Sequence, residues 1–500
     1  MHNKAGKIKY KEQILLSAIL LLALVLGLFF YTGVDYSDSL AYSEFAYNLS
    51  KGSLALEVNH SAFRLGLLYP VSLIYSMFGV SQFSSNILVL IFSLASIILI
   101  YKFGSLLFNT KVGLLSAALL SFFPLDVVYS TRLLTDLPSA FFVSLSVYLF
   151  LKQEKMHTNI KSSIYLVISG MSLGIAYLIR EMSLLIVIFF AAYFIYNMKF
   201  KINYALAALG FIMVASLELV YFFSLTGNAF FRLSLVSSDW VAAMKATNFF
   251  GTGSFPISIL HHLYIIFTDN LLGTYYLFIF TAVTYAIVYK KKEAYALLLW
   301  FIPVLAYIVF GTASLSSYIP FPAGSRFLSI VTMPSILILS YFLMQNESVI
   351  KRVLLPSVVV LLFVTSVAYI YTSPERFSLD EIENAYNYIN KLPTKKIYTD
   401  QRTAMVLSFL DGYKGSHRIE KFSSYKYSIK DGKYLNVFVS NLSGVKDSYI
   451  VVNWKIINFL TDSKKGVRFP DQIYNLPENW VLKKEIGKGS SRVAIYYAPK

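Results

Sequence analysis

The residues best suited to chemistry lie in one stretch, DYSDSLAYSEFAYNLSKG, which runs from Asp35 to Gly52. A helix that begins near Ser37 would place Asp38 and Tyr42 on one face, because residues four apart lie side by side on a helix. Apolar positions on the same helix could rest on a membrane surface, so that a carboxylate projects from an interfacial helix. A simpler interpretation is that Asp35 or Ser37 only caps the helix.

Further charged residues lie at the ends of apolar segments elsewhere in the chain: Arg64, Asp136, Arg180, Glu181 and Arg326. Charged groups at membrane depth are costly and tend to line a functional cavity. Two simpler interpretations remain open: Asp136 could cap the helix that Pro138 begins, and Arg180 and Glu181 could form a polar hairpin between two helices.

A cavity that combines carboxylates with arginines suits group transfer from an anionic leaving group. One carboxylate can accept the proton of a hydroxyl as a general base, while arginine binds a phosphate through fixed hydrogen-bond donors. We therefore expect group transfer at a membrane face.

The composition is that of a multi-span membrane protein. Of the 500 residues, 56% are hydrophobic and only 14% are charged, and the mean hydropathy is +0.60. Soluble proteins carry roughly 25% charged residues. The formal charge of +17 is better explained by cytoplasmic loops facing anionic lipid than by nucleic acid, which we exclude as a partner. With no cysteine, disulfides and thiolate chemistry are excluded.

Eleven apolar segments are long enough, or nearly so, to cross a hydrocarbon core that needs about 20 helical residues. They lie near residues 13–31, 85–103, 112–130, 137–151, 163–180, 182–198, 204–225, 269–289, 294–312, 327–344 and 353–372. The first follows several lysines as a signal peptide does, but no small-residue cleavage site follows it, so we expect it to remain as a span.

The basic residues predict the orientation of these spans. If the N-terminus is cytoplasmic, sixteen basic residues fall in inner loops and seven in outer segments before residue 373. The sixteen are Lys4, Lys7, Lys9, Lys11, Lys102, Lys111, Lys152, Lys155, Lys161, Lys199, Lys201, Lys290, Lys291, Lys292, Lys351 and Arg352; the seven are Lys51, Arg64, Arg132, Arg180, Arg232, Lys245 and Arg326. The positive-inside rule then predicts a multi-pass cell-membrane protein with a cytoplasmic N-terminus and an extracytoplasmic C-terminus.

The composition changes near Pro374, where charged residues become dense and apolar runs become strand-length. We expect a transmembrane domain over residues 1–373, with outer loops at 32–84, 226–268 and 312–326, and a soluble extracytoplasmic α/β domain over residues 374–500. Within it, residues 379–392 should form a helix and the next strand should end at Asp400, which either belongs to a ligand site or starts a turn. His261 and His262 point to different helix faces, so they make a poor metal pair.

Several short motifs, in this order and at these spacings, resemble the polyprenyl-phosphate-sugar glycosyltransferases of the C-type fold (GT-C). They are the Asp35–Gly52 stretch, Arg64 with Tyr69 and Pro70, Phe78–Gly79, Asp136 with Pro138, Gly174–Glu181 and Ser325–Pro334. The protein-O-mannosyltransferases and the aminoarabinose transferases are the most similar branches. The resemblance covers most of residues 30–335.

The resemblance implies inverting transfer of a hexosyl or pentosyl group from a polyprenyl-phosphate sugar to a hydroxyl of a protein, lipid or glycan acceptor on the extracytoplasmic face. It places Asp38 at the catalytic carboxylate and Asp136 at a second acidic position. Family members commonly have Asp-Glu at the first position, whereas here Ser39 follows Asp38. Asp35 and Glu44 are the candidate substitutes for the missing glutamate.

The donor phosphate should be bound chiefly by Arg326 and Arg180, with Arg64 as a third candidate, since arginine binds phosphate bidentately. We expect five further residues in the substrate cavity: Asp35, Tyr42, Glu44, Tyr69 and Glu181. Neither a metal nor another cofactor is expected to be required. The alternative is a transporter or flippase of lipid-linked glycans, but transporters usually place polar sites near the bilayer midplane and at internal repeats.

Overall fold

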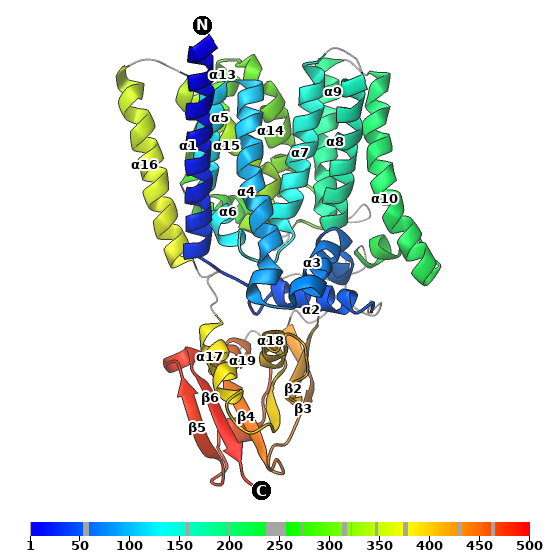
Figure 1. Ribbon diagram of the computed structural model, residues 1–500, viewed down its shortest axis with the longest axis vertical. Helices are drawn as coiled ribbons and strands as arrows, with labels where there is room; N and C mark the ends of the chain where they lie inside the picture. Colours follow the sequence, from blue (N-terminus) through cyan, green and yellow to red (C-terminus); the bar gives the residue numbers. More distant parts are fainter. Residues whose placement is uncertain are drawn as a thin grey trace.

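A bundle of helices and a smaller unit built on a β-sheet make up the computed structural model (Figure 1). The structure describes residues 2–53, 60–156, 160–198, 201–236, 257–272, 274–312, 318–321, 323–345, 349–373, 379–428, 433–461 and 466–500. The N-terminus lies at the end of the bundle that is remote from the sheet (Figure 1).

The helices of the bundle run roughly alongside one another (Figure 1). They are α1 (His2–Phe29), α4 (Gln82–Leu107), α5 (Thr110–Ser121), α7 (Asp136–Glu154), α8 (Ile160–Ile179), α9 (Val187–Asn197), α10 (Ala205–Thr226), α13 (Tyr275–Val288), α14 (Tyr295–Phe310), α15 (Ser329–Met344) and α16 (Val349–Thr372). In the described part of the chain, seven helical segments are long and apolar enough to cross a membrane. Each of the eleven expected spans overlaps a helix, but α5, α9 and α13 are short, so the number eleven stays a prediction.

The expected span at residues 112–130 is wrong as a single helix. The chain turns at Phe122 and Phe123 between α5 and the short helix α6 (Pro124–Tyr129). Pro124 is the first residue of α6, a position that suits a residue without a backbone N–H, whereas in a helix interior proline would break a hydrogen bond.

Close helix contacts hold the bundle together. Gly170 in α8 and Gly210 in α10 face backbone of the other helix: a Cβ on Gly170 would lie 1.8 Å from the carbonyl oxygen of Ala207. Small residues allow this approach of two helix backbones in a membrane. Helix α15 lies at the centre, with 89% of its most apolar stretch buried, and the 3₁₀ turn η5 (Ser325–Leu328) precedes it. A rigid central helix therefore positions Arg326.

A layer of short helices separates the bundle from the sheet (Figure 1). It contains α2 (Asp38–Ser50), η1 (His60–Phe63) and α3 (Leu65–Phe78). The predicted helix near Ser37 is confirmed as α2, whereas α3 was not predicted and lies inside the expected loop at residues 32–84. Ser43 of α2 hydrogen-bonds the hydroxyl of Tyr75 of α3 at 2.8 Å. Burial of the apolar face of α2 fixes the direction in which Asp38 points.

The other two expected outer loops lie partly outside the described residues. In the first, α12 (Ile257–Thr268) occupies the end of the range 226–268. In the loop expected at residues 312–326, the last described residues belong to η5, which carries Arg326.

The C-terminal unit contains a mixed six-stranded sheet in the order β3-β2-β1-β4-β6-β5. Its elements are α17 (Asp380–Ile389), β1 (Lys396–Asp400), α18 (Gln401–Leu410), β2 (Ile419–Ser428), β3 (Lys433–Val439), β4 (Ser448–Asn453), α19 (Trp454–Thr461), β5 (Val481–Ile486) and β6 (Val493–Ala498). Strand β1 is parallel to β2 and β4, and the remaining pairs are antiparallel. The predicted α/β fold, the helix within residues 379–392 and the strand ending at Asp400 are confirmed.

The carboxyl ends of β1 and β4 face the layer formed by α2. From β1 the chain continues to β2 on one side, and from β4 it continues to β5 at the opposite edge of the sheet. Asn453 at the end of β4 donates to the hydroxyl of Tyr36 at 2.8 Å, and Tyr47 of α2 stacks on Tyr413 with ring centroids 4.8 Å apart. Asp400 caps α18 through the backbone N–H groups of Arg402 and Thr403, as the turn interpretation predicts.

We expect the sheet to lie outside the cytoplasm. Cysteines introduced at Lys51 and Ser443 should react with an impermeant thiol reagent in intact cells, whereas cysteines at Lys111 and Lys292 should react only after permeabilisation. All four positions are exposed, and the chain has no competing cysteine. The opposite labelling pattern would show that the orientation is reversed.

Candidate functional site

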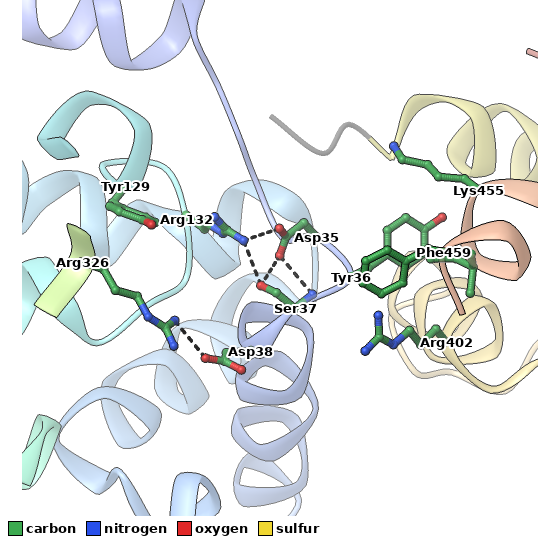
Figure 2. Close-up of a pocket in the computed structure, with 11 residues that line it drawn as sticks. Asp35, Tyr36, Ser37, Asp38, Tyr129, Arg132, Arg326, Arg402, Lys455 and Phe459 are labelled. Carbon is green, nitrogen blue, oxygen red and sulfur yellow. Dashed lines mark hydrogen bonds and ion pairs between the residues drawn. The ribbon is translucent and has the colours of Figure 1, made fainter. Parts of the chain in front are cut away.

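A cavity of about 530 Å³ lies between the α2 layer and the C-terminal unit (Figure 2). It is lined by Asp35, Tyr36, Ser37, Asp38, Tyr129, Arg132, Arg326, Arg402, Lys455, Ile456 and Phe459. Its volume falls within the range of about 300–1,000 Å³ that is usual for small-molecule sites. Its residues come from the bundle, from the α2 layer and from the sheet unit.

Asp38 and Arg326 form the accessible ion pair of this cavity. Asp38 is the first residue of α2, and its carboxylate lies 3.0 Å from the guanidinium of Arg326 (Figure 2). Their side chains are 52% and 32% exposed. Burial opposes ionisation of Asp38, but the guanidinium groups of Arg326 and Arg64 outweigh burial and hold the pKa of this carboxyl below its ordinary value. Asp38 is therefore a carboxylate that a ligand in the cavity can reach.

Asp35 forms a second, tighter ion pair with Arg132. The carboxylate of Asp35 accepts hydrogen bonds from the hydroxyls of Ser37, at 2.5 Å, and Ser39, at 2.6 Å. Arg132 also donates to the Ser37 hydroxyl at 3.0 Å. Ser37 is the N-cap residue of α2 by position, but its side chain makes no capping hydrogen bond. Asp35 and Ser37 thus hold a charged network together as well as starting the helix.

Asp136 and Arg180 form a buried ion pair behind the cavity. Asp136 is the first residue of α7 and Thr135 is its N-cap, so the interpretation of Asp136 as the cap is wrong. Arg180 and Arg326 both lie over the ring of Phe327, with their guanidinium carbons 4.9 Å and 5.3 Å from its centroid. Phe327 therefore connects the buried pair to the accessible one.

Arg64, Glu181 and Arg232 continue the charged network. Arg64 donates to the hydroxyl of Tyr42 and lies 3.9 Å from Glu181. Arg232 is almost fully buried and lies 2.5 Å from both Glu181 and Glu218. The two residues of the expected Arg180–Glu181 hairpin thus have separate partners. Arg232 is part of the buried core here, not an exposed loop residue.

The structure brings most of the predicted site residues together at one end of the bundle, but not all of them. Glu44 does not line the described cavity, and the charge that acts on it is Lys421 of the sheet unit. Tyr69 is 57% exposed on α3 and is not among the lining residues. Tyr42 and Glu181, the other residues expected in the substrate cavity besides Asp35, do not line it either. That these four residues contact the substrate stays a prediction.

Seven lining residues were missed by the sequence analysis: Tyr36, Tyr129, Arg132, Arg402, Lys455, Ile456 and Phe459. The sequence could have indicated Arg132, because it lies in the same connection between apolar segments as Asp136. Arg402, Lys455 and Phe459 gave no signal, since only the docking of the sheet brings them near Asp38. Among the described residues, no group of three or more His, Asp or Glu side chains could hold a metal ion. That no metal is required stays a prediction.

Comparisons with known proteins agree with this geometry. Residues 65–221 match the model of the dolichyl-phosphate-mannose-protein mannosyltransferase family. The structure of ArnT from Cupriavidus metallidurans bound to undecaprenyl phosphate is similar, with a TM-score of 0.61, 12% identity, and coverage of 97% of this chain and 99% of ArnT. No curated protein sequence matches the chain.

A second solved structure has the same architecture over most of the chain. It is the archaeal oligosaccharyltransferase AglB from Archaeoglobus fulgidus in complex with an inhibitory peptide and a dolichol-phosphate. The TM-score is 0.52 at 12% identity, and the match covers 90% of this chain and 70% of AglB. The chain therefore has the C-type glycosyltransferase fold, and the resemblance seen in the sequence is confirmed.

We expect Arg232 to be essential for stability. Arg232→Ala leaves Glu181 and Glu218 buried without their main partner, which typically costs about 3–5 kcal/mol. Thermal unfolding of the purified protein in detergent measures the loss, and Arg232→Ala/Glu218→Gln should recover part of it. The control is Arg418→Ala, whose side chain is 72% exposed; equal stability of the two arginine variants would contradict the prediction.

Proposed function

We propose that this protein is a glycosyltransferase that moves a sugar from a polyprenyl-phosphate donor to an acceptor hydroxyl in the cavity, with inversion, on the extracytoplasmic face. The observation that carries the proposal is the accessible Asp38–Arg326 pair, 3.0 Å apart, at the boundary between the bundle and the sheet unit. ArnT and AglB have been solved with undecaprenyl phosphate and dolichol-phosphate respectively, which supports a lipid-phosphate donor.

The reaction requires one base and one stabilised leaving group. Asp38 accepts the proton of the acceptor hydroxyl while the acceptor oxygen forms a bond to the anomeric carbon of the sugar. The bond between that carbon and the phosphate oxygen breaks, and its electron pair stays on the phosphate. The products are the glycosylated acceptor, the polyprenyl phosphate and a proton on Asp38.

Arg326 is the best placed of the three arginines predicted to bind the donor phosphate. It lines the cavity, whereas Arg180 is buried against Asp136, and the side chain of Arg64 is 11% exposed and bonded to Tyr42. A donor phosphate that binds Arg326 would weaken the ion pair between Arg326 and Asp38. The pKa of Asp38 would then rise as the donor binds, so that the base becomes stronger when the substrate is in place.

Asp136 has a different role in this proposal from that of Asp38. It is 3% exposed and its carboxylate is engaged by Arg180. Because it does not line the cavity, we assign it as a positioning residue that acts through Arg180 and Phe327 on Arg326. This revises the expectation that Asp136 acts directly in catalysis.

The geometry favours a transferase over a flippase. The charged residues lie at one end of the bundle, whereas a transport pathway needs polar groups near the midplane. Glu218, a charge within α10, is 4% exposed and is paired with Arg232. It therefore belongs to a closed ion pair and lines no pathway in the described part of the chain.

Asp38→Asn keeps the size of the side chain but removes the base. General bases contribute on the order of 10²–10⁴-fold in rate, so turnover should fall by that factor while the donor still binds. Reconstitution with lipid-linked sugars and detection of the new glycosidic bond by mass spectrometry measures this loss. Turnover of purified Asp38→Asn near the wild-type level would exclude Asp38 as the base.

Two substitutions of Arg326 should separate its two effects. Arg326→Lys keeps the charge but loses bidentate binding, so the KM for the donor should rise on the order of tenfold, while the acid limb of the pH profile stays in place. Arg326→Gln removes the charge that lowers the pKa of Asp38, so the acid limb of kcat/KM should move to higher pH.

The control for both substitutions is Arg418→Lys on the exposed surface of the sheet unit, which should behave as the wild type does. An unchanged acid limb in Arg326→Gln would show that Arg326 does not lower the pKa of Asp38. An unchanged donor KM in Arg326→Lys would show that Arg326 does not bind the donor phosphate bidentately.

A further inference from the structure

One carboxylate inside the bundle has no arginine beside it. Asp126, on the short helix α6, is 7% exposed, and its Oδ2 atom is buried without a hydrogen-bond partner. No ion pair of the described residues includes it, although Asp35, Asp136 and Glu181 each have one. A buried carboxylate without a partner is costly, and an ionisable residue at membrane depth usually has a function.

Asp126 lines a second cavity, of about 20 Å³, which shares no lining residue with the cavity that contains Asp38. A cavity of this size has room for one particle as large as a water molecule. Its other polar lining residues are four buried hydroxyl side chains, and the rest of the lining is apolar. The four are Ser96 of α4, Ser144 of α7, and Ser329 and Thr332 of α15.

The hydroxyl groups in this cavity offer oxygen lone pairs more than protons. Ser96 donates to the carbonyl oxygen of Phe92 at 2.9 Å, and Thr332 donates more weakly to that of Leu328 at 3.4 Å. These protons are directed to the backbone of their own helices, so they do not compensate Asp126. Oxygen acceptors from four helices therefore surround one carboxylate, and the group that is missing among them is a positive one.

We propose that this cavity binds one sodium ion, held by the carboxylate of Asp126 and by hydroxyl oxygens of α4, α7 and α15. Hard cations take several oxygen ligands, whereas the O–H of a protonated carboxyl would need only one acceptor. A single carboxylate is neutralised by a monovalent cation. Magnesium gives up its water molecules reluctantly and usually keeps several of them, for which a cavity of 20 Å³ has no room.

The position of the ion links it to the cavity that contains Asp38. Tyr129, which lines that cavity (Figure 2), lies one helical turn after Asp126 on α6. Ser329 begins α15, directly after the turn η5 that carries Arg326. The ion would thus fix α6 and the start of α15 against α4 and α7, and so hold Tyr129 and Arg326 in place. It lies outside the reaction cavity and takes no part in sugar transfer.

Thermal unfolding of the full-length protein in nanodiscs tests the site without any substrate, so the result does not depend on the proposed function. Sodium chloride replaces N-methylglucamine chloride at constant ionic strength, and potassium and magnesium chlorides are the comparison salts. A ligand that binds only the folded state stabilises it more as its concentration rises. The melting temperature should therefore rise with the logarithm of the sodium concentration, and potassium and magnesium should have no such effect.

Asp126→Asn keeps the shape of the side chain but removes its charge, so the variant should lose the response to sodium. Its control is Asp471→Asn, which removes a carboxylate from an exposed position of the sheet unit and should keep the response. A melting temperature of the wild type that does not depend on sodium, an equal response to potassium or magnesium, or a full response in Asp126→Asn would each overturn the proposal.

Ser144→Ala tests the hydroxyl ligands while it leaves Asp126 in place. Loss of one ligand should raise the sodium concentration at half-maximal stabilisation on the order of tenfold, as for the loss of one hydrogen bond to a charged group. The control is Ser224→Ala on the exposed face of α10, which should leave this concentration unchanged. Equal sodium concentrations in the two serine variants would also overturn the proposal, and this holds even if Asp126→Asn does not fold.

Discussion

Buried charge at the membrane boundary is the constraint on which this structure depends. A carboxylate removed from water is costly unless a partner compensates it, and removal of one partner costs several kcal/mol. Here Asp35, Asp136 and Glu181 each bind an arginine from a distant part of the chain. These pairs fix the ends of several helices relative to one another. Because the carboxylates around them are paired with arginines, Asp38 and Arg326 are held in fixed positions by their surroundings.

The sheet unit completes the site from the opposite side. Tyr36 and Tyr47, which flank or belong to the α2 region, contact Asn453 and Tyr413 of this unit. The segment that carries Asp38 is therefore held between the bundle and the sheet. In the proposed function, a donor with a lipid tail would reach the cavity from the bundle, and a water-soluble acceptor group would reach it from the sheet. The two walls can then bind different ligands because they are built by different parts of the fold.

The sequence predicted most of the helices and that the charged residues lie at one end of the bundle, but it did not predict α3 or which distant residues pair. Asp38, Arg64, Asp136, Glu181 and Arg326 could be placed at one membrane face because hydropathy and basic residues fix the direction of each span. That Arg180 binds Asp136, and Glu181 binds Arg232, depends on helix packing that periodicity does not encode. That Glu44 and Tyr69 do not line the cavity depends on the same packing. That Arg402 and Lys455 line the cavity follows only from the docking of the sheet, which no local pattern records.

The departure from the family pattern at Ser39 has a physical explanation in this network. Ser39 is fully buried and its hydroxyl donates to Asp35, whose carboxylate also binds Arg132. A glutamate at this position would place a second buried carboxylate beside Asp35, and like charges in such a site disfavour ionisation of both. Of the two candidate substitutes for the missing glutamate, Asp35 lines the cavity and Glu44 does not. We infer that Asp35 supplies the second acidic group of the site, moved to the residue that precedes the helix, with Arg132 as its counter-ion.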